Sequence, residues 1–323
     1  MRMTATNHFW RGVACALGGA TLWGFSGACI QFLGENYAIT SSFISFVRAA
    51  VAAVLFIAVV LATRREALLS LLGARAARGP LLLFGVGLYL SQITYAISIE
   101  YTNAGTATVL QATCTVFVML FTCLKLRRAP RVPDLIGLVC ALAAATLIAT
   151  QGDWGVIVLP MAGLAWGIVN ALSETLYIMA PQRLYGRWDR VTIISCGMVI
   201  SGIAAALVWA AQAVGGGAGL SSLVPALDAV GWLALIGGVG LLGTFAAFGL
   251  FLYGVSLVGS VKGSLLGVAE PAGAMVIAAL WLGTAFSGAD WAGLILMAAM
   301  ITLVSLSGAK GERASGAAAP PAS

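Results

Sequence analysis

Ten apolar runs, each long enough to cross a lipid bilayer as a helix, divide this sequence. A bilayer core of about 30 Å requires roughly 20 consecutive apolar residues in helical form. Only 9% of the residues are charged, whereas a soluble domain carries about 25%, so water is not the main solvent of this chain. We therefore predict an all-α polytopic membrane protein with ten transmembrane helices. The runs lie at about 12–33, 41–62, 80–101, 104–124, 132–150, 157–179, 191–213, 229–254, 259–282 and 289–307.

The positive charges predict how these runs are oriented. With ten spans, every one of the 17 Lys and Arg residues except Arg48 falls on the same side of the membrane. Lys and Arg are enriched in cytoplasmic loops, so we expect a multi-pass protein of the plasma (cell inner) membrane with both termini in the cytoplasm. The net charge of +6 is then explained by the Lys and Arg residues of the cytoplasmic loops, and no nucleic-acid partner is expected. The opposite connections contain Glu35, Asn103, Asp153, Asp228 and Asp290.

The chain also shows an internal repeat. Positions 22–24 (Leu-Trp-Gly) match positions 165–167 (Ala-Trp-Gly), and positions 134–137 match 290–293 at an offset of 156 residues. Five spans per half is an odd number, so the second half must enter the membrane from the opposite side. Such inverted repeats are a transporter architecture with a binding site near the midplane. The expected organisation is a first five-helix repeat at 10–150, a second at 155–307, and a disordered cytoplasmic tail at 308–323.

Over about residues 10–307, the sequence resembles the ten-helix EamA-type branch of the drug/metabolite transporter superfamily. The resemblance rests on the duplicated halves and on local motifs: the Trp-Gly pairs at 23–24 and 166–167, Arg48, the segment YTNAGTATVLQ at 101–111, and Glu270-Pro271. It implies a central cavity between the halves and transport by alternating access. Members of this superfamily move amino acids, amines, nucleobases, sugar-linked metabolites or drugs, so the resemblance leaves the cargo open.

An enzymatic alternative starts from Ser26, which lies in the stretch Gly24-Phe-Ser-Gly27 of the first run. A serine hydrolase needs a base within hydrogen-bond reach of its nucleophile. The single histidine, His8, lies about 18 residues before Ser26, or roughly 27 Å along a helix. The six cysteines all fall within apolar runs without metal-ligand spacing. We therefore expect no enzyme, metal or cofactor, and interpret Ser26 as part of a small-residue packing strip or as a cavity residue.

Three ionisable residues fall inside the runs, where charge is costly and usually functional. Arg48 lies near the middle of the second run, Glu174 in the sixth, and Glu270 in the ninth, directly before Pro271. For Arg48 and Glu270, two roles stay open: structural ion pairing or support of a kinked helix, and direct contact with substrate. Either glutamate could exchange a proton with the medium.

Polar and aromatic residues on the inward faces of several runs predict the substrate site. Trp166, Asn170 and Glu174 recur at helical spacing, and Trp23 is the repeat partner of Trp166. Aromatic walls with a carboxylate suit an amine through cation–π attraction, and with Arg48 they suit an amino acid. The predicted substrate-binding residues are Trp23, Ser26, Arg48, Tyr89, Gln92, Tyr95, Gln111, Trp166, Asn170, Glu174, Phe248 and Glu270.

The function expected from the sequence is secondary transport of a small amphipathic metabolite, amino-acid-like or amine, with export favoured over import. An importer of an organic cation is the alternative within transport, and an intramembrane hydrolase using Ser26 is the disfavoured alternative of another class. Proton exchange and facilitated diffusion both stay open, as do monomer and homodimer. Membrane lipid and one small molecule are the expected partners. The linker 64–79, with leucines between arginines, is expected to form a short amphipathic helix on the membrane surface.

Overall fold

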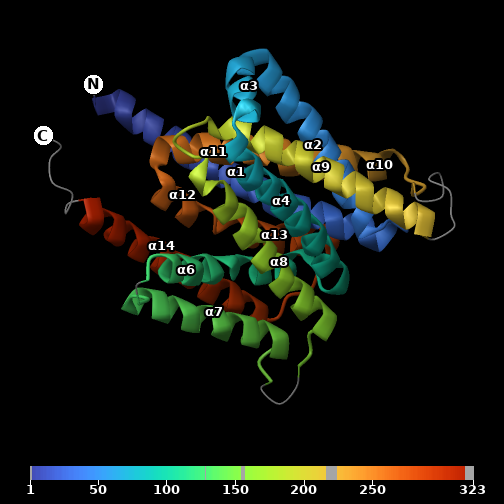
Figure 1. The fold of residues 1–323 in the computed structure, drawn as a ribbon. Coiled ribbons are helices and arrows are strands. Elements are labelled where there is room, and N and C mark those ends of the chain that lie inside the picture. Colours follow the sequence, from blue (N-terminus) through green and yellow to red (C-terminus); the bar gives the residue numbers. More distant parts are fainter. Residues whose placement is uncertain (1, 128, 154–156, 216–223, 317–323) are drawn as a thin grey trace, which may run out of the picture.

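The structure is a computed structural model that describes residues 2–127, 129–153, 157–215 and 224–316. Within these ranges the chain is helical between its turns, and an isolated bridge between Tyr185 and Trp188 is the β contact present. The helices form one bundle (Figure 1), with α7 at one edge, α2 and α3 at the opposite edge, and α4 between them. The predicted all-α class therefore agrees with the structure.

The helices keep the order of the predicted runs, with several of them subdivided. The first half contains α1 Arg2–Asn36, α2 Ser41–Thr63, α3 Arg65–Gly73, α4 Arg75–Tyr101, α5 Ala104–Ala112, α6 Cys114–Lys125 and α7 Val132–Thr150. The second half contains α8 Met161–Met179, the short 3-10 helix η1 Ala180–Arg183, α9 Arg190–Gly215, α10 Ala229–Trp232, the π-helix η3 Leu233–Ala246, α11 Ala247–Val258, α12 Ser260–Leu266, α13 Ala269–Leu282 and α14 Gly288–Gly316.

Seven helical segments of the described residues are long and apolar enough to cross a membrane, and two shorter apolar helices lie at Ala269–Leu282 and Gly288–Val304. Large apolar side chains cover the outside of the bundle. Leu280 is 84% exposed and Ile295 is 69% exposed. Such a surface would drive association in water but is the expected contact surface in lipid. The fold is therefore that of a polytopic helical membrane protein.

Two predicted spans are interrupted. The fourth breaks at Thr113, whose hydroxyl donates to Leu110 O at 2.6 Å. The ninth breaks between α12 and α13, two residues before Pro271, because proline has no N–H for the helical ladder. The repeat offset of 156 residues carries position 113 to 269, beside the second break. The two interruptions thus occupy matching places in the two halves, and the second creates a helix N-terminus inside the bundle.

Small residues allow α1 to lie close to its neighbours. A Cβ added at Gly19 would come within 2.7 Å of Ala247 O and Phe251 N in α11, and one added at Gly24 within 2.6 Å of Glu270 O in α13. Close approach through small residues replaces the hydrophobic effect as the source of packing energy between membrane helices. This contact brings Trp23 of α1 beside α11 and α13.

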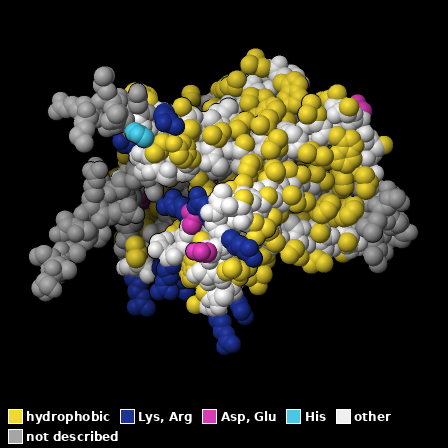
Figure 2. Space-filling view, turned by 90° about the horizontal axis from the view of Figure 1, so that it is seen from above, with side chains coloured by type: hydrophobic (Ala, Val, Ile, Leu, Met, Phe, Trp, Pro, Cys, Tyr) yellow, Lys and Arg dark blue, Asp and Glu magenta, His cyan; other side chains and the backbone are white. Residues whose placement is uncertain are grey.

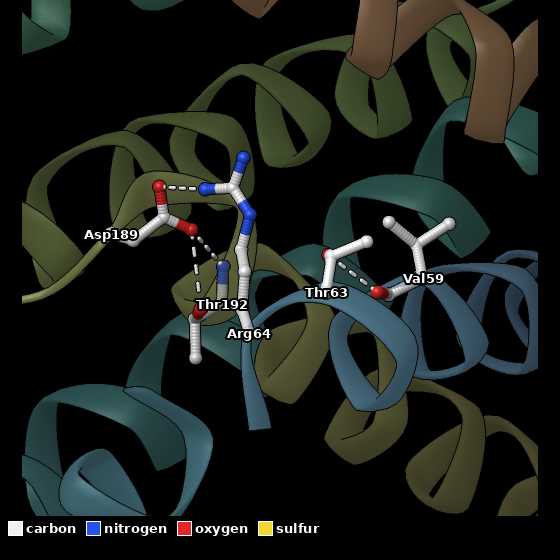
Figure 3. A network of polar contacts seen from close by, with 5 residues as sticks. All are labelled: Val59, Thr63, Arg64, Asp189 and Thr192. Atoms are coloured by element: carbon white, nitrogen blue, oxygen red, sulfur yellow. Dashed lines mark hydrogen bonds and ion pairs between the residues drawn. The ribbon is translucent and has the colours of Figure 1, made fainter. Parts of the chain in front are cut away.

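One end of the bundle carries most of the Lys and Arg residues. In Figure 2, Lys and Arg side chains gather toward one end of the molecule, and hydrophobic side chains cover much of the rest of that face. At this end, Arg64 follows α2 and forms an ion pair with Asp189, which precedes α9 (Figure 3). Asp189 also accepts from Thr192 N at 3.0 Å, which caps the first turn of α9. We call this the basic end.

The surroundings of Asp189 stabilise its ionised form. Partial burial alone would raise the pKa of this carboxyl, but the hydrogen bonds from Thr192 and the adjacent Arg64 guanidinium together hold its pKa below the ordinary aspartate value. The pair is partly exposed, with 40% and 34% of the side chains accessible, so it contributes little to stability. It joins the C-terminal end of α2 to the N-terminal end of α9 at the basic end.

Two expectations outside the spans can be compared with the described residues. The linker 64–79 contains α3, with Leu68 and Leu71 buried and Leu69 and Leu72 exposed, as expected of an amphipathic helix. The expected disordered tail at 308–323 differs in its first part, because α14 continues to Gly316. Ala, Lys, Glu and Arg in this stretch favour helix. Residues 317–323 of the expected tail lie outside the described residues.

The close α1–α11 contact predicts a strong difference between neighbouring glycines. Gly19→Ala should lower the unfolding temperature in detergent and cost about 1–3 kcal/mol, because its Cβ would meet backbone atoms that cannot move aside. Gly18→Ala is the matched control, since a Cβ there meets nothing within 4 Å. Equal unfolding temperatures for the two variants would contradict the observed packing.

Candidate functional site

A small cavity of about 60 Å³ lies deep in the bundle, where helices of both halves meet. It is bounded by α1, α2, α4 and α5 from the first half and by α8, α11 and α13 from the second. Its walls combine three charged side chains with aromatic rings and amides. The lining residues are Trp23, Arg48, Leu88, Ser91, Gln92, Tyr95, Gln111, Glu174, Tyr177, Phe248 and Glu270.

Arg48 is held from the side by the π-helix. Its Nε donates to Thr244 Oγ1 at 2.9 Å, and the Thr244 hydroxyl donates to Val239 O at 2.8 Å, five residues earlier. That spacing belongs to the wider π-turn, which is rare and occurs often at functional sites. Arg48 is 8% exposed and interacts electrostatically with Glu270. The guanidinium is therefore oriented by one neutral partner and lies near one anionic partner.

Glu270 lies in the first turn of α13, where the break before Pro271 exposes the positive end of the helix dipole. A carboxylate is stabilised at such an N-terminus. Gln111 Nε2 donates to Glu270 Oε1 at 3.1 Å. The interrupted ninth span thus explains how a carboxylate is accommodated within the bundle.

Glu174 comes from α8 and is less completely paired. Its Oε1 accepts from Tyr177 OH at 3.2 Å, while its Oε2 is buried without a hydrogen-bond partner among the described residues. The two glutamates are close enough to interact electrostatically. Across the cavity, Tyr95 OH shares a 2.6 Å hydrogen bond with Thr108 Oγ1. The cavity therefore contains two carboxylates, one guanidinium and one carboxylate oxygen that lacks a donor.

A larger cavity of about 680 Å³ adjoins the small one and shares Trp23, Gln111, Glu174, Tyr177, Phe248 and Glu270 with it. It runs toward the basic end, where Gln182, Tyr185 and Arg190 lie in its wall. Much of the remaining wall is apolar. The apolar lining includes Phe84, Ile178, Ile194, Phe251, Leu252, Val255 and Ile301.

The other end of the bundle is closed by rings and hydrogen bonds between the halves. Phe46 stacks on Trp209 with centroids 4.9 Å apart and planes 3° apart, and Phe43 contacts both Trp209 and Trp232. Three side-chain bonds join α1 and α2 or the turn between them to the second half: Tyr37 to Asp228 at 2.6 Å, Ser42 to Gln212 at 2.6 Å and Gln31 to Thr284 at 2.9 Å. We call this the sealed end.

The structure brings most of the predicted binding residues to the small cavity. Those that line it are Trp23, Arg48, Gln92, Tyr95, Gln111, Glu174, Phe248 and Glu270. Tyr177 and Ser91 also line it but were not predicted as binding residues. Tyr177 could have been found from the sequence, because it lies three residues after Glu174 on the same helix face. Thr244, which orients Arg48, could not, because it lies in a π-helix and its direction does not follow a 3.6-residue pattern.

Four predicted binding residues lie elsewhere. Ser26 is buried against Gly243 of η3 without a hydrogen-bond partner, as in the packing interpretation. Tyr89 packs with Ala49 and Ala205 between α2 and α9. Asn170 Nδ2 donates to Ser91 O at 2.7 Å and joins α8 to α4. In each case helix packing occupies the side chain.

Trp166 is the fourth of these residues and departs from the expected tryptophan pair. Trp23 lines the cavity and packs on Phe248 and Phe251, with centroids 5.0 and 4.8 Å away. Trp166 is half-buried and lines neither cavity. The reason is that Gly163 and Gly167 occupy the inner face of α8, where an added Cβ would meet Thr102 and Leu110. The indole therefore lies beside that face.

Comparisons with known proteins agree with this architecture. The family model described as the EamA-like transporter family matches residues 10–150 and again 161–306. One relative, named as the uncharacterized inner membrane transporter YicL of Salmonella typhimurium, is 29% identical over 309 residues, covering 94% of this chain and 98% of the relative. A solved crystal structure is similar with a TM-score of 0.59 at 16% identity, covering 91% of this chain and 97% of the other; this likeness concerns the fold alone.

The one-sided opening predicts unequal reactivity of introduced cysteines. In a background without the native cysteines, Leu252→Cys should react rapidly with a water-soluble maleimide in detergent, because Leu252 lines the large cavity. Leu235→Cys is the matched control, since Leu235 is fully buried in the cluster near the sealed end. Comparable labelling rates, followed by intact-protein mass spectrometry, would show that the cavity is not open as described.

Proposed function

We propose, because this chain belongs to the EamA-like transporter family, that it is a secondary transporter of a small amphipathic metabolite working by alternating access. The observation that carries the proposal is the charged and aromatic cavity deep in the bundle, which continues into a wide cavity that extends toward the basic end. A carrier needs a site that communicates with one side at a time. We assign the structure to the state open at the basic end.

The topology we propose has ten spans in two inverted halves, with both termini in the cytoplasm of a cell whose plasma (inner) membrane holds the protein. Three observations support it. The family model matches the chain twice, the interruptions before α6 and before α13 occupy matching positions, and α1 begins on the side of the bundle where α14 ends (Figure 1). The basic end then faces the cytoplasm. Repeats at 10–150 and 155–307 form the two halves.

The cargo we propose is an amine or an amino-acid-like compound, and the direction is export. Glu174 and Glu270 supply negative charge, Arg48 can receive a carboxylate, and Trp23 and Phe248 provide an apolar wall. Import of an organic cation is the second candidate, because the same carboxylates and rings would bind a cation. A hydrolase is not favoured: Ser26 is packed against Gly243, away from His8 at the start of α1.

Coupling to protons follows from the same charges. Two carboxylates beside one guanidinium leave an excess negative charge within an apolar bundle, and such charge is costly unless it is neutralised. A proton and a cationic substrate would each neutralise it, so we propose that they exchange across the membrane. Uptake that is independent of a proton gradient would point to facilitated diffusion.

Reconstituted protein should transport members of a panel of amines and amino acids. Flux into proteoliposomes should rise above that of empty vesicles. Uptake of a cation should accelerate when the vesicle interior is more acidic than the medium, because protons then leave as the cation enters. Radiolabel accumulation measures both effects. If no solute in the panel moves, while a positive-control carrier in the same lipid is active, the proposed function fails.

Substitution of the two repeat-related tryptophans should have unequal effects. Trp23→Ala should reduce transport by about tenfold or more, because it removes a wall of both cavities and its contacts with Phe248 and Phe251. Trp166→Ala should retain most activity, since that ring lines neither cavity. Rates are compared at equal amounts of reconstituted protein. Equal losses in both variants would contradict the placement of the site.

A further inference from the structure

Two hydrogen-bond acceptors in the wall of the small cavity have no N–H or O–H donor among the described residues. They are Glu174 Oε2 from α8 and Gln92 Oε1 from α4. Both side chains are more than nine-tenths buried, with exposed fractions of 9% and 6%. The Cys114 thiol, a weak donor, interacts with the Glu174 carboxyl. The Gln92 amide donates a weak hydrogen bond from Nε2 to Met198 Sδ at 3.9 Å. The wall of the cavity therefore includes two side chains, from the adjacent helices α4 and α8, that each carry an unpaired buried acceptor.

Their neighbours in the same wall are paired within the protein. Glu270 Oε1 accepts from Gln111, Glu174 Oε1 from Tyr177, and Tyr95 bonds with Thr108. Buried polar groups are almost always satisfied in folded proteins, and an exception calls for an explanation. A ligand that donates two hydrogen bonds supplies that explanation.

Charge and size restrict this donor further. The charged groups of the lining are Arg48 from α2, Glu174 from α8 and Glu270 from α13, which leaves an excess of negative charge when both carboxyls are ionised. The small cavity holds about 60 Å³, roughly the liquid volume of two water molecules. A compact cationic head group with N–H donors fits both conditions.

The adjoining cavity accommodates the rest of such a molecule. It holds about 680 Å³, shares Glu174 and Trp23 with the small cavity, and has an apolar wall that includes Phe251 and Leu252. A hydrophobic substituent on the head group would therefore extend toward the basic end. The two cavities together describe an amphipathic ligand with one compact polar end.

We propose that the substrate head group is a primary or secondary ammonium whose N–H groups donate to Glu174 Oε2 and Gln92 Oε1, while its apolar part occupies the larger cavity. This deepens the proposed function and rests on it, since the same site is the transport site. It excludes fully methylated ammonium ions, which carry the same charge but have no N–H. Charge attraction alone would give ammonium ions with N–H groups and fully methylated ammonium ions similar affinities.

The test is calorimetric binding to the purified full-length protein in lipid nanodiscs. The probes are 2-phenylethylamine, its N-methyl derivative, its N,N,N-trimethyl derivative and its neutral N-acetyl derivative. The first two should bind, and the trimethyl compound should bind about tenfold or more weakly, because the N–H bonds are lost. The acetyl compound should bind weakly as well, since it has no charge. Equal affinity for the primary and trimethyl compounds would overturn the proposal.

Variants separate hydrogen bonding from size. Gln92→Met removes the acceptor at similar volume, so it should weaken binding of the primary amine by about tenfold and leave the trimethyl compound unchanged. Glu66→Gln, on the surface helix α3, is the matched control and should leave every affinity unchanged. If Gln92→Met leaves the primary amine unaffected, exclusion of the trimethyl group is steric and the proposed bonds are absent.

The ligand series on the unmodified protein needs no variant to fold, and equal affinity for the primary and trimethyl compounds would overturn the proposal by itself. If no amine binds but the proteoliposome panel shows transport of another solute, this inference fails while the proposed function stands. If the panel shows no transport of any solute, the proposed function fails, and the binding series still reports whether the head-group site exists.

Discussion

The three charged side chains that line the small cavity constrain much of the structure around them. Arg48 requires an acceptor, which Thr244 supplies from the π-helix. Glu270 requires positive potential, which the broken ninth span supplies by ending one helix and starting another directly before it. Neither device improves the packing of helices. Irregular backbone is tolerated at membrane depth where it is enclosed by protein or lines a cavity. Here the π-helix contacts Arg48 of the small cavity through Thr244, and Gly267 of the α12–α13 break lines the large cavity.

The small residues of α1 make this arrangement possible. Gly19 and Gly24 let α1 approach α11 and α13 so closely that a methyl group would not fit. The approach places Trp23 against Phe248 and Phe251 and brings it to the wall of the cavity that contains Glu270. A wider separation would leave a larger and wetter space, in which the charges would be solvated and would select a ligand less strongly. The packing of α1 and the polarity of the site are therefore coupled.

The sequence predicted the positions of most helices well, because the length and hydropathy of each apolar run can be read directly from it. It also placed Glu174, Glu270 and Arg48 at one site, since lipid would reject them and only the interior is left. It was less successful for residues on the edge of a helical face. Trp166 is one position away from Gly167, and the helical spacing alone could not show that glycines, not the indole, meet α4 and α5. Thr244 was not predicted at all, because its direction depends on a π-helical register that has no signature in the hydrophobic pattern.

The two ends of the bundle differ in how they are closed, and this difference bears on the mechanism. The sealed end is held by hydrogen bonds between the halves, which include those of Tyr37, Ser42 and Gln31, and by the stacked pair Phe46 and Trp209. Each such bond is worth about 1 kcal/mol net, and opening this end would also separate side chains of the apolar cluster that contains Leu33 and Phe43. At the basic end, α2 packs along α9 and the ion pair of Arg64 with Asp189 lies between them, while α11 and α14 contribute another part of the wall of the large cavity. Closure there would require α11 and α14 to approach α9, with α2 and α9 moving as one unit.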